Sequence, residues 1–204
     1  MKDIDLTSSD VLHLSKQLLG YKLCTRVDGV TTTGIIVETE AYRAPEDKAS
    51  HAYNGRRTSR TETIFQRGGI SYVYLCYGIH HLFNVVTGPK DTAHAILIRA
   101  LEPLGGIPIM QERRGLTVPK SRLTNGPGKL CQALGITKAL DGVDLTGQEN
   151  SKVWLEKGIS VDPSEIVASK RVGIDYAEEW KEKLWRFYIN GNLHVSVIDR
   201  QVKI

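Results

Sequence analysis

Residues 34–42 read Gly-Ile-Ile-Val-Glu-Thr-Glu-Ala-Tyr, a run rich in β-branched side chains that also contains two acids. Such a run is typical of a β-strand, in which successive side chains point to opposite faces. Strict alternation places Glu38 and Glu40 on one face together with Ile36 and Tyr42. The other face then holds Ile35, Val37, Thr39 and Ala41. A buried carboxylate costs several kcal/mol unless it is paired or hydrogen-bonded, so both acids are predicted to have partners.

Turn residues and apolar alternation predict further strands around this one. They span residues 21–27, 71–76, 80–87, 93–101, 165–172, 184–189 and 193–198, and the central strand extends back to residue 30. Asp28-Gly29, Tyr77-Gly78 and Asn190-Gly191-Asn192 provide the turns of three hairpins. Helices are predicted between the N-cap cluster at 8–10 and Gly20, over 105–114 and over 130–134, with a helical turn at 176–180.

Two residues stand out from these elements. Arg99 lies inside the apolar run Ile96-Leu-Ile-Arg-Ala-Leu101, and a buried cation needs a buried anion. Glu38 and Glu40 are the predicted partners. Tyr77 is expected at or near a hairpin tip, where the apolar surface of an aromatic side chain stays exposed to water unless it meets a binding partner.

Length and composition describe an ordinary globular chain. With 204 residues, 41% hydrophobic and 25% charged, the sequence predicts a single domain over residues 1–204. No apolar run is long enough to span a bilayer, and the N-terminus lacks the apolar core of a signal peptide, so we expect a cytoplasmic protein. The three cysteines are scattered singly, which predicts neither disulfides nor a thiolate metal site.

The positive charge is unevenly distributed. The net charge is +4, and residues 111–138 hold six Lys or Arg against one acid. The segment 43–69 is a long predicted loop with several arginines, and loops of this length are usually functional or disordered. Its composition favours contact with phosphate groups, although a solvated basic face explains the charge of residues 111–138 equally well.

The sequence can be tested against several kinds of chemistry by the residue types each one needs. Six side chains could be gathered into a metal site, but no metal-binding His spacing is present: Glu38, Glu40, Asp47, His51, His80 and His81. Lys48 and Lys90 lie in polar loops, where nothing would lower the pKa of an amine nucleophile. A carboxylate with an Arg partner remains, and it suits bond cleavage through an oxocarbenium-like transition state. Aromatic side chains that can stack on a flat base surround it in the predicted fold: Tyr42, His51, Tyr72, Tyr74 and Tyr77.

The sequence resembles the vertebrate-type alkyladenine (3-methyladenine) DNA glycosylases, a family that also occurs in bacteria. The resemblance extends from Leu18 to Arg200. It rests on these motifs: Val37-Glu-Thr-Glu-Ala-Tyr42, Pro45-Glu-Asp47, Ser50-His51, Tyr72-Val-Tyr74, Tyr77-Gly78, Asn84, Leu97-Ile-Arg-Ala-Leu-Glu-Pro103, Gly126-Pro-Gly-Lys-Leu-Cys-Gln-Ala-Leu134, Arg171-Val-Gly173, Arg186-Phe-Tyr188 and Val195-Ser-Val-Ile-Asp-Arg200. It implies an α+β fold, a single mixed domain with a curved antiparallel β-sheet flanked by short helices.

The resemblance also implies roles for the catalytic positions. Glu40 resembles the general base that deprotonates the water attacking C1′ of the flipped nucleotide. Arg99 resembles the residue that helps to hold this water and the carboxylate, and the carbonyl of Val172 resembles a third contact to the water. The role of Glu38 is not specified.

Other positions resemble the pocket and the DNA contacts of the family. Tyr42 and His51 correspond to residues on one face and edge of the base, Tyr74 to the aromatic on the opposite face, and Asn84 to the side chain that rejects guanine. Tyr77 resembles the wedge that replaces the flipped nucleotide. The DNA backbone contacts are carried over to Arg56, Thr58, Arg60 and Lys129. Ser59 departs from the family, which often has proline there, and this puts DNA affinity or loop order in question.

The resulting hypothesis is a monofunctional, cofactor-free DNA repair glycosylase. It would act as a monomer on duplex DNA containing damaged purines, in the bacterial nucleoid. Two alternatives stay open: a metal-dependent nuclease or hydrolase using Glu38, Glu40 and His51, and a non-catalytic binder of damaged DNA or RNA. The sequence does not identify a proton source for neutral leaving bases.

Overall fold

The computed structural model describes residues 4–115, 117–147 and 151–198. Within these residues the chain is a mixed α+β protein built on one eight-stranded sheet. The strands are β1 (Lys22–Val27), β2 (Val30–Arg43), β3 (Ser71–Cys76), β4 (His80–Thr87), β5 (His94–Gly105), β6 (Val153–Glu156), β7 (Ile166–Ser169) and β8 (Arg186–Ile189). The α-helices are α1 (Val11–Gln17), α2 (Ile107–Arg114) and α3 (Pro127–Leu134). The 3-10 helices are η1 (Tyr53–Gly55), η2 (Glu62–Phe65), η3 (Lys120–Arg122), η4 (Lys138–Leu140), η5 (Pro163–Glu165) and η6 (Asp175–Glu182).

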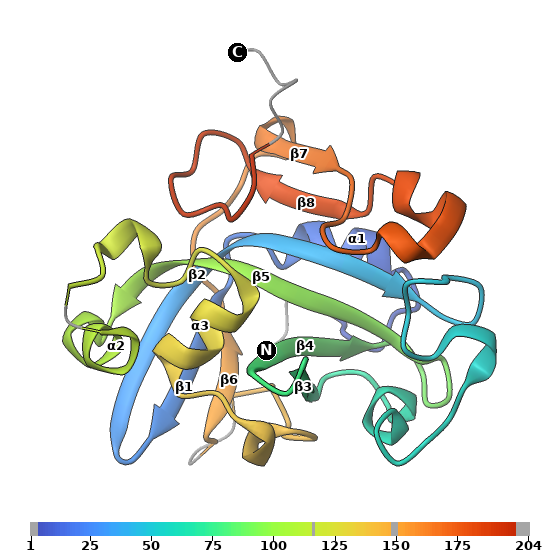
Figure 1. Cartoon of the computed structure of the whole chain (residues 1–204), viewed down its shortest axis with the longest axis horizontal. Helices are drawn as coiled ribbons and strands as arrows, with labels where there is room; N and C mark the ends of the chain where they lie inside the picture. The colour runs from blue at the N-terminus through green and yellow to red at the C-terminus, as the bar shows by residue number, and fades with distance from the viewer. Residues whose placement is uncertain (1–3, 116, 148–150, 199–204) are drawn as a thin grey trace.

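Strand β2 is the centre of the sheet. One of its edges pairs with β5, and the other pairs first with β1 and then, at Glu38 to Glu40, with β8 (Figure 1). All strand pairs named here are antiparallel, in the order β3-β4-β5-β2-β1-β6, and β7 joins through β8. The prediction of an α+β fold with an antiparallel sheet is confirmed.

Strict alternation fails in the middle of β2. The register with β5 shifts between Ile36 and Glu38, and again between Glu38 and Thr39. As a result Ile36 packs in the main core cluster with Ala41, whereas Val37 packs in a separate cluster with Tyr188. The prediction that Ile36 shares a face with the acids is therefore wrong, because a bulge inserts one residue and reverses the alternation.

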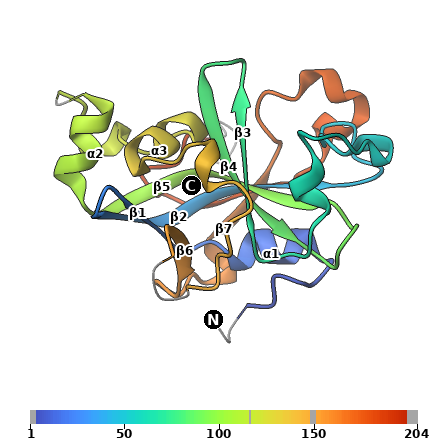
Figure 2. The same ribbon diagram turned by 90° about the horizontal axis from the view of Figure 1, so that it is seen from below.

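Helices α1 and α3 pack over different parts of the sheet, and both contribute to the main core cluster. Helix α1 packs on β2, β5 and β8, and α3 packs on β4 and β5. In the view of Figure 2, β2 and β5 pass between α1 and α3, and the tip of the β3–β4 hairpin extends beyond the rest of the sheet. The side chain of Asp10 caps α1 by accepting a hydrogen bond from the His13 amide, as the predicted N-cap cluster requires. The three cysteines are free thiols.

Two features of the C-terminal half differ from the prediction. Residues 193–198 do not form a strand, although their alternation predicted a hairpin with 184–189. Their backbone has another use, because the Ser196 amide donates to Glu38 and the Val197 carbonyl accepts from Arg186. Strand β8 pairs instead with β2 and β7. Strand β6 was not predicted, because it is short and lies in a turn-rich segment.

Candidate active site

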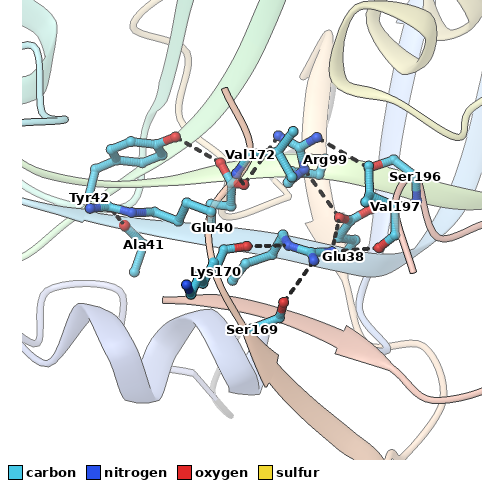
Figure 3. Close-up of polar contacts among 12 residues, drawn as sticks. Glu38, Glu40, Ala41, Tyr42, Arg99, Ser169, Lys170, Val172, Ser196 and Val197 are labelled. Carbon is cyan, nitrogen blue, oxygen red and sulfur yellow. Dashed lines mark hydrogen bonds and ion pairs between the residues drawn. The ribbon is translucent and has the colours of Figure 1, made fainter. Parts of the chain in front are cut away.

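Glu40 is completely buried, and its carboxylate is held by polar partners (Figure 3). Its Oε1 accepts a hydrogen bond from the Val172 amide at 2.7 Å and lies 3.2 Å from Nη1 of Arg99. Its Oε2 accepts a hydrogen bond from the Tyr42 hydroxyl at 2.7 Å. A carboxylate has about four lone-pair positions, so one position on Oε2 stays open to a further donor such as water.

Glu38 is also completely buried, and it lies beside the same arginine (Figure 3). Its Oε1 accepts from Nε of Arg99 at 3.2 Å and from Nη1 of Arg186 at 3.0 Å, and its Oε2 accepts from the Ser196 amide at 2.7 Å. The predicted pairing of Arg99 with both acids is confirmed. Burial acts to lower the pKa of Arg99, but the charges of Glu40 and Glu38 outweigh it and raise this pKa.

A cavity of about 630 Å³ opens beside these groups. Tyr42, Arg99 and Val172, the three direct partners of Glu40, line it, so Glu40 lies one contact behind the cavity wall. The remaining walls come from distant segments and contain several aromatic side chains among aliphatic and polar ones. They include His51, Tyr72, Tyr74, Tyr77, Asn84 and Tyr176. Every catalytic and pocket position carried over from the resemblance therefore lies in or directly behind one cavity.

The aromatic wall is held together by ring contacts. The His51 ring lies edge-on to Tyr74 at 4.5 Å, and its Nδ1 is 3.0 Å from the Tyr72 hydroxyl. Tyr72 and Tyr74 are stacked at 5.4 Å. Burial, helped by the charges of Arg60 and Arg56, lowers the pKa of His51 to about 4, so the ring is neutral at neutral pH. Burial also raises the pKa of Tyr72 to about 12 and that of Tyr42 well above its ordinary value, the latter assisted by Glu40.

Asn84 is fixed within this wall. It is buried, and its side-chain amide donates to the Tyr72 carbonyl at 3.1 Å. Since this hydrogen bond links β4 to β3, the orientation of the Asn84 side chain is set by the sheet itself.

The positions that resemble DNA contacts of the family are exposed, and Tyr77 and Arg60 among them line the cavity. Tyr77 has a positive φ of 50° at the tip of the β3–β4 hairpin, and 91% of its surface is exposed. Arg56, Thr58 and Arg60 are exposed in the loop before β3 and line a smaller adjoining cavity. Lys129 is exposed near the start of α3, where its amine donates to the Asn125 side chain at 3.0 Å.

Sequence reasoning missed a buried ion pair behind the site. The guanidinium of Arg171 donates to both carboxylate oxygens of Asp47, at 2.5 and 2.9 Å, and both side chains are completely buried. Arg171 also donates to the Ala41 carbonyl and lies 4.8 Å from the Tyr42 ring centre. It therefore ties the arginine-rich loop to β2. Arg186 was missed as well, although it occurs within an apolar run, which is the same pattern that identified Arg99.

Within residues 4–115, 117–147 and 151–198, no group of three or more His, Cys, Asp or Glu side chains is arranged so that it could hold a metal ion. The same residues contain no helix that is both long and apolar enough to cross a membrane.

A buried carboxylate behind an aromatic cavity suits an enzyme that hydrolyses a glycosyl bond to a flat base. Comparison with known proteins identifies the family. Residues 5–193 match the methylpurine-DNA glycosylase family, and the chain belongs to it. It is a DNA-3-methyladenine glycosylase, a hydrolase of N-glycosyl bonds that acts in base excision repair.

Curated relatives agree with this family. A Chlamydia felis protein named "Putative 3-methyladenine DNA glycosylase" is 51% identical over 184 residues, which cover 90% of this chain and 92% of the relative. A Natranaerobius thermophilus protein of the same name is 44% identical over 96% of this chain and 98% of its own length. An Encephalitozoon cuniculi protein named "Probable DNA-3-methyladenine glycosylase" is 48% identical over 93% of this chain and 89% of its own length.

Proposed function

We propose that this glycosylase flips an alkylated or deaminated purine out of duplex DNA into the 630 Å³ cavity and releases it with a water activated by Glu40. The product is an abasic site in an unbroken strand. Substrates of the 3-methyladenine, hypoxanthine and ethenoadenine type are proposed. The observation that carries the proposal is a fully buried carboxylate whose three direct partners line an aromatic cavity.

The arrangement around Glu40 suits a general base. Arg99 and the Val172 amide hold Oε1 in place, and the free lone pair on Oε2 can accept a hydrogen bond from a water at the cavity wall. The carbonyl of Val172 is proposed as a second acceptor for this water. As the glycosidic bond lengthens, the negative charge of Glu40 stabilises the developing oxocarbenium ion.

The cavity walls suit a flat base. Tyr42 has the Arg171 guanidinium near its ring and lines the cavity, and Tyr74 lines it from β3. The two rings are proposed to lie on opposite faces of the flipped purine, with His51 at its edge. Asn84 is proposed to exclude guanine, since its fixed side chain leaves no room for a 2-amino group.

The exposed rim suits DNA. Tyr77 is proposed as the wedge that fills the gap in the duplex, because its ring has almost no protein neighbours to pack on. Arg56, Thr58, Arg60 and Lys129 are proposed to contact backbone phosphates. This electrostatic part of binding carries no sequence information, as a repair enzyme that must scan all DNA requires.

The nature of the leaving base affects the rate. A cationic 3-methyladenine leaves without further protonation, whereas hypoxanthine benefits from an acid. The neutral His51 ring and the tyrosines with raised pKa values are poor acids at neutral pH. We therefore propose that cationic lesions are released faster than neutral ones.

The test compares the wild-type protein with Glu40→Gln on duplex DNA containing hypoxanthine or 3-methyladenine, with and without EDTA. Loss of a general base should slow base release about 10²- to 10⁴-fold, while lesion binding survives. Free base and an alkali-labile, unnicked strand are the expected wild-type products. Undiminished release by Glu40→Gln would refute the mechanism. Nicked product that disappears in EDTA would favour a metal-dependent nuclease, and binding without free base would favour a non-catalytic protein.

A further inference from the structure

The guanidinium of Arg99 is fixed by three separate partners. Its Nη1 faces Glu40, its Nε donates to Glu38, and its Nη2 donates to the Ser196 hydroxyl at 3.2 Å. Rotation of the guanidinium about any axis breaks at least one of these contacts. The direction in which Arg99 presents Nη1 to Glu40 and to the cavity is therefore set on the side opposite Glu40, by Glu38 and Ser196.

Glu38 is fixed in its turn by the C-terminal part of the chain. Arg186 donates to it from β8, and the Ser196 amide donates to its other oxygen. Arg186 is held by the Lys170 and Val197 carbonyls at 2.7 Å and by the Ser169 hydroxyl at 2.8 Å. All three partners of Glu40 line the cavity, whereas Arg99 is the one partner of Glu38 named here that does, so Glu38 lies on the far side of Arg99 from the cavity.

We infer that Glu38 is a positioning residue for base release: it orients Arg99 toward Glu40, and Arg186 with residues 196–197 locks Glu38 in place. This inference rests on the proposed function of Glu40. The two glutamates and two arginines form a buried set with no net charge, in which Arg99 divides its contacts between a catalytic and a structural carboxylate. The bulge in β2 contributes to this arrangement, because the register shifts on both sides of Glu38 bring its side chain to the cluster of two glutamates and two arginines.

The test is Glu38→Gln in single-turnover release of hypoxanthine from duplex DNA. A misplaced Arg99 should lower the rate constant about 10- to 100-fold. Lesion-duplex affinity should change by less than about threefold, because Glu38 is remote from the DNA. A folded Glu38→Gln variant with the wild-type rate would overturn the inference, and so would a loss of binding that accounts for the loss of rate.

Rescue by a conservative variant separates positioning from a merely structural role. Glu38→Asp keeps a carboxylate that can pair with Arg99 and Arg186, whereas Glu38→Gln removes the charge from both ion pairs. Glu38→Asp should therefore recover at least part of the release rate that Glu38→Gln loses. Release as slow in a folded Glu38→Asp variant as in Glu38→Gln would contradict the inference.

Controls keep the result interpretable. Glu102→Gln removes a carboxylate from the same strand as Arg99, where it accepts a hydrogen bond from the Asn192 side chain, and should leave release unchanged. If Glu38→Gln does not fold, Ser196→Ala and Arg186→Lys replace it. Slower release with intact binding in these variants supports the inference, and wild-type release in both overturns it. Undiminished release by Glu40→Gln would instead refute the proposed function.

Discussion

The buried cluster behind the cavity and the exposed rim in front of it use charge in opposite ways. In the cluster, Glu38, Glu40, Arg99 and Arg186 satisfy one another, and their side chains are at most 7% exposed. At the rim, Arg56 and Arg60 are exposed and have few partners within the protein. Burial makes the cluster intolerant of any unpaired charge, and exposure leaves the rim free to pair with a polyanion. The proposed reaction and the proposed binding of DNA thus fall in two regions, one buried and internally paired and the other exposed.

The largest effect on stability is expected at Asp47, which joins the two regions. Asp47→Asn would leave the buried guanidinium of Arg171 without its anion, which should lower the free energy of unfolding by about 3–5 kcal/mol. Urea unfolding measures this change. Glu62→Gln, which breaks an exposed ion pair with Arg57, is the matched control and should lower the free energy of unfolding far less, because water already screens the pair. Equal losses would mean that burial does not distinguish the two regions.

A pH-dependent effect is expected at His51, on the boundary between cluster and rim. Its pKa is lowered from 6.5 to about 4 in the folded protein, so between these values the unfolded chain binds a proton that the folded protein does not. Stability is therefore lost as the pH falls through this window, by at most about 3 kcal/mol from His51. His51→Gln should reduce the difference between urea midpoints at pH 7.5 and pH 4. An unchanged difference would show that His51 is not buried in its neutral form.

The sequence predicted the sheet well where one pattern dominated. The hairpins around Asp28-Gly29 and Tyr77-Gly78 and the strand containing Arg99 are all present, because turn chemistry and alternation agreed there. The failures share a cause. Residues 193–198 alternate like a strand, but their backbone groups hydrogen-bond to the buried side chains of Glu38 and Arg186. The bulge beside Glu38 places its side chain where these hydrogen bonds can form. Local periodicity contains no information about such tertiary demands.

The site was predictable in part for a similar reason. Charges inside apolar runs identified Glu38, Glu40 and Arg99, since a charge in a buried run must be paired to offset its desolvation. The pairing of Asp47 with Arg171 could not be foreseen, because both lie in irregular segments far apart in sequence. Tyr176 was likewise missed as a cavity residue, since an exposed aromatic in a 3-10 helix has no distinguishing pattern.

A smaller effect, on binding alone, is expected at the hairpin tip. Tyr77→Ala should weaken binding to a lesion duplex by about 1–3 kcal/mol, the contribution of one stacking aromatic. Binding to the same lesion in a single strand should weaken less, because there is no gap to fill. Stability should not change, because the ring is 91% exposed. Fluorescence anisotropy with both DNA forms measures the difference, and equal losses on the two forms would argue against a wedge.

The smallest effect is expected from the individual cations of the rim, and here the loop provides its own control. Arg57 is occupied by Glu62 and Asp91, at 2.6 and 2.7 Å, whereas Arg56 is exposed one residue earlier. Arg56→Gln should reduce the slope of log affinity against log salt by about 0.9, the value for one phosphate contact, on damaged and undamaged duplexes alike. Arg57→Gln should leave the slope nearly unchanged, because its guanidinium already has anions within the protein. If both variants lost the same slope, exposure and not internal pairing would determine which arginines meet DNA, and the loop would act as a diffuse basic surface.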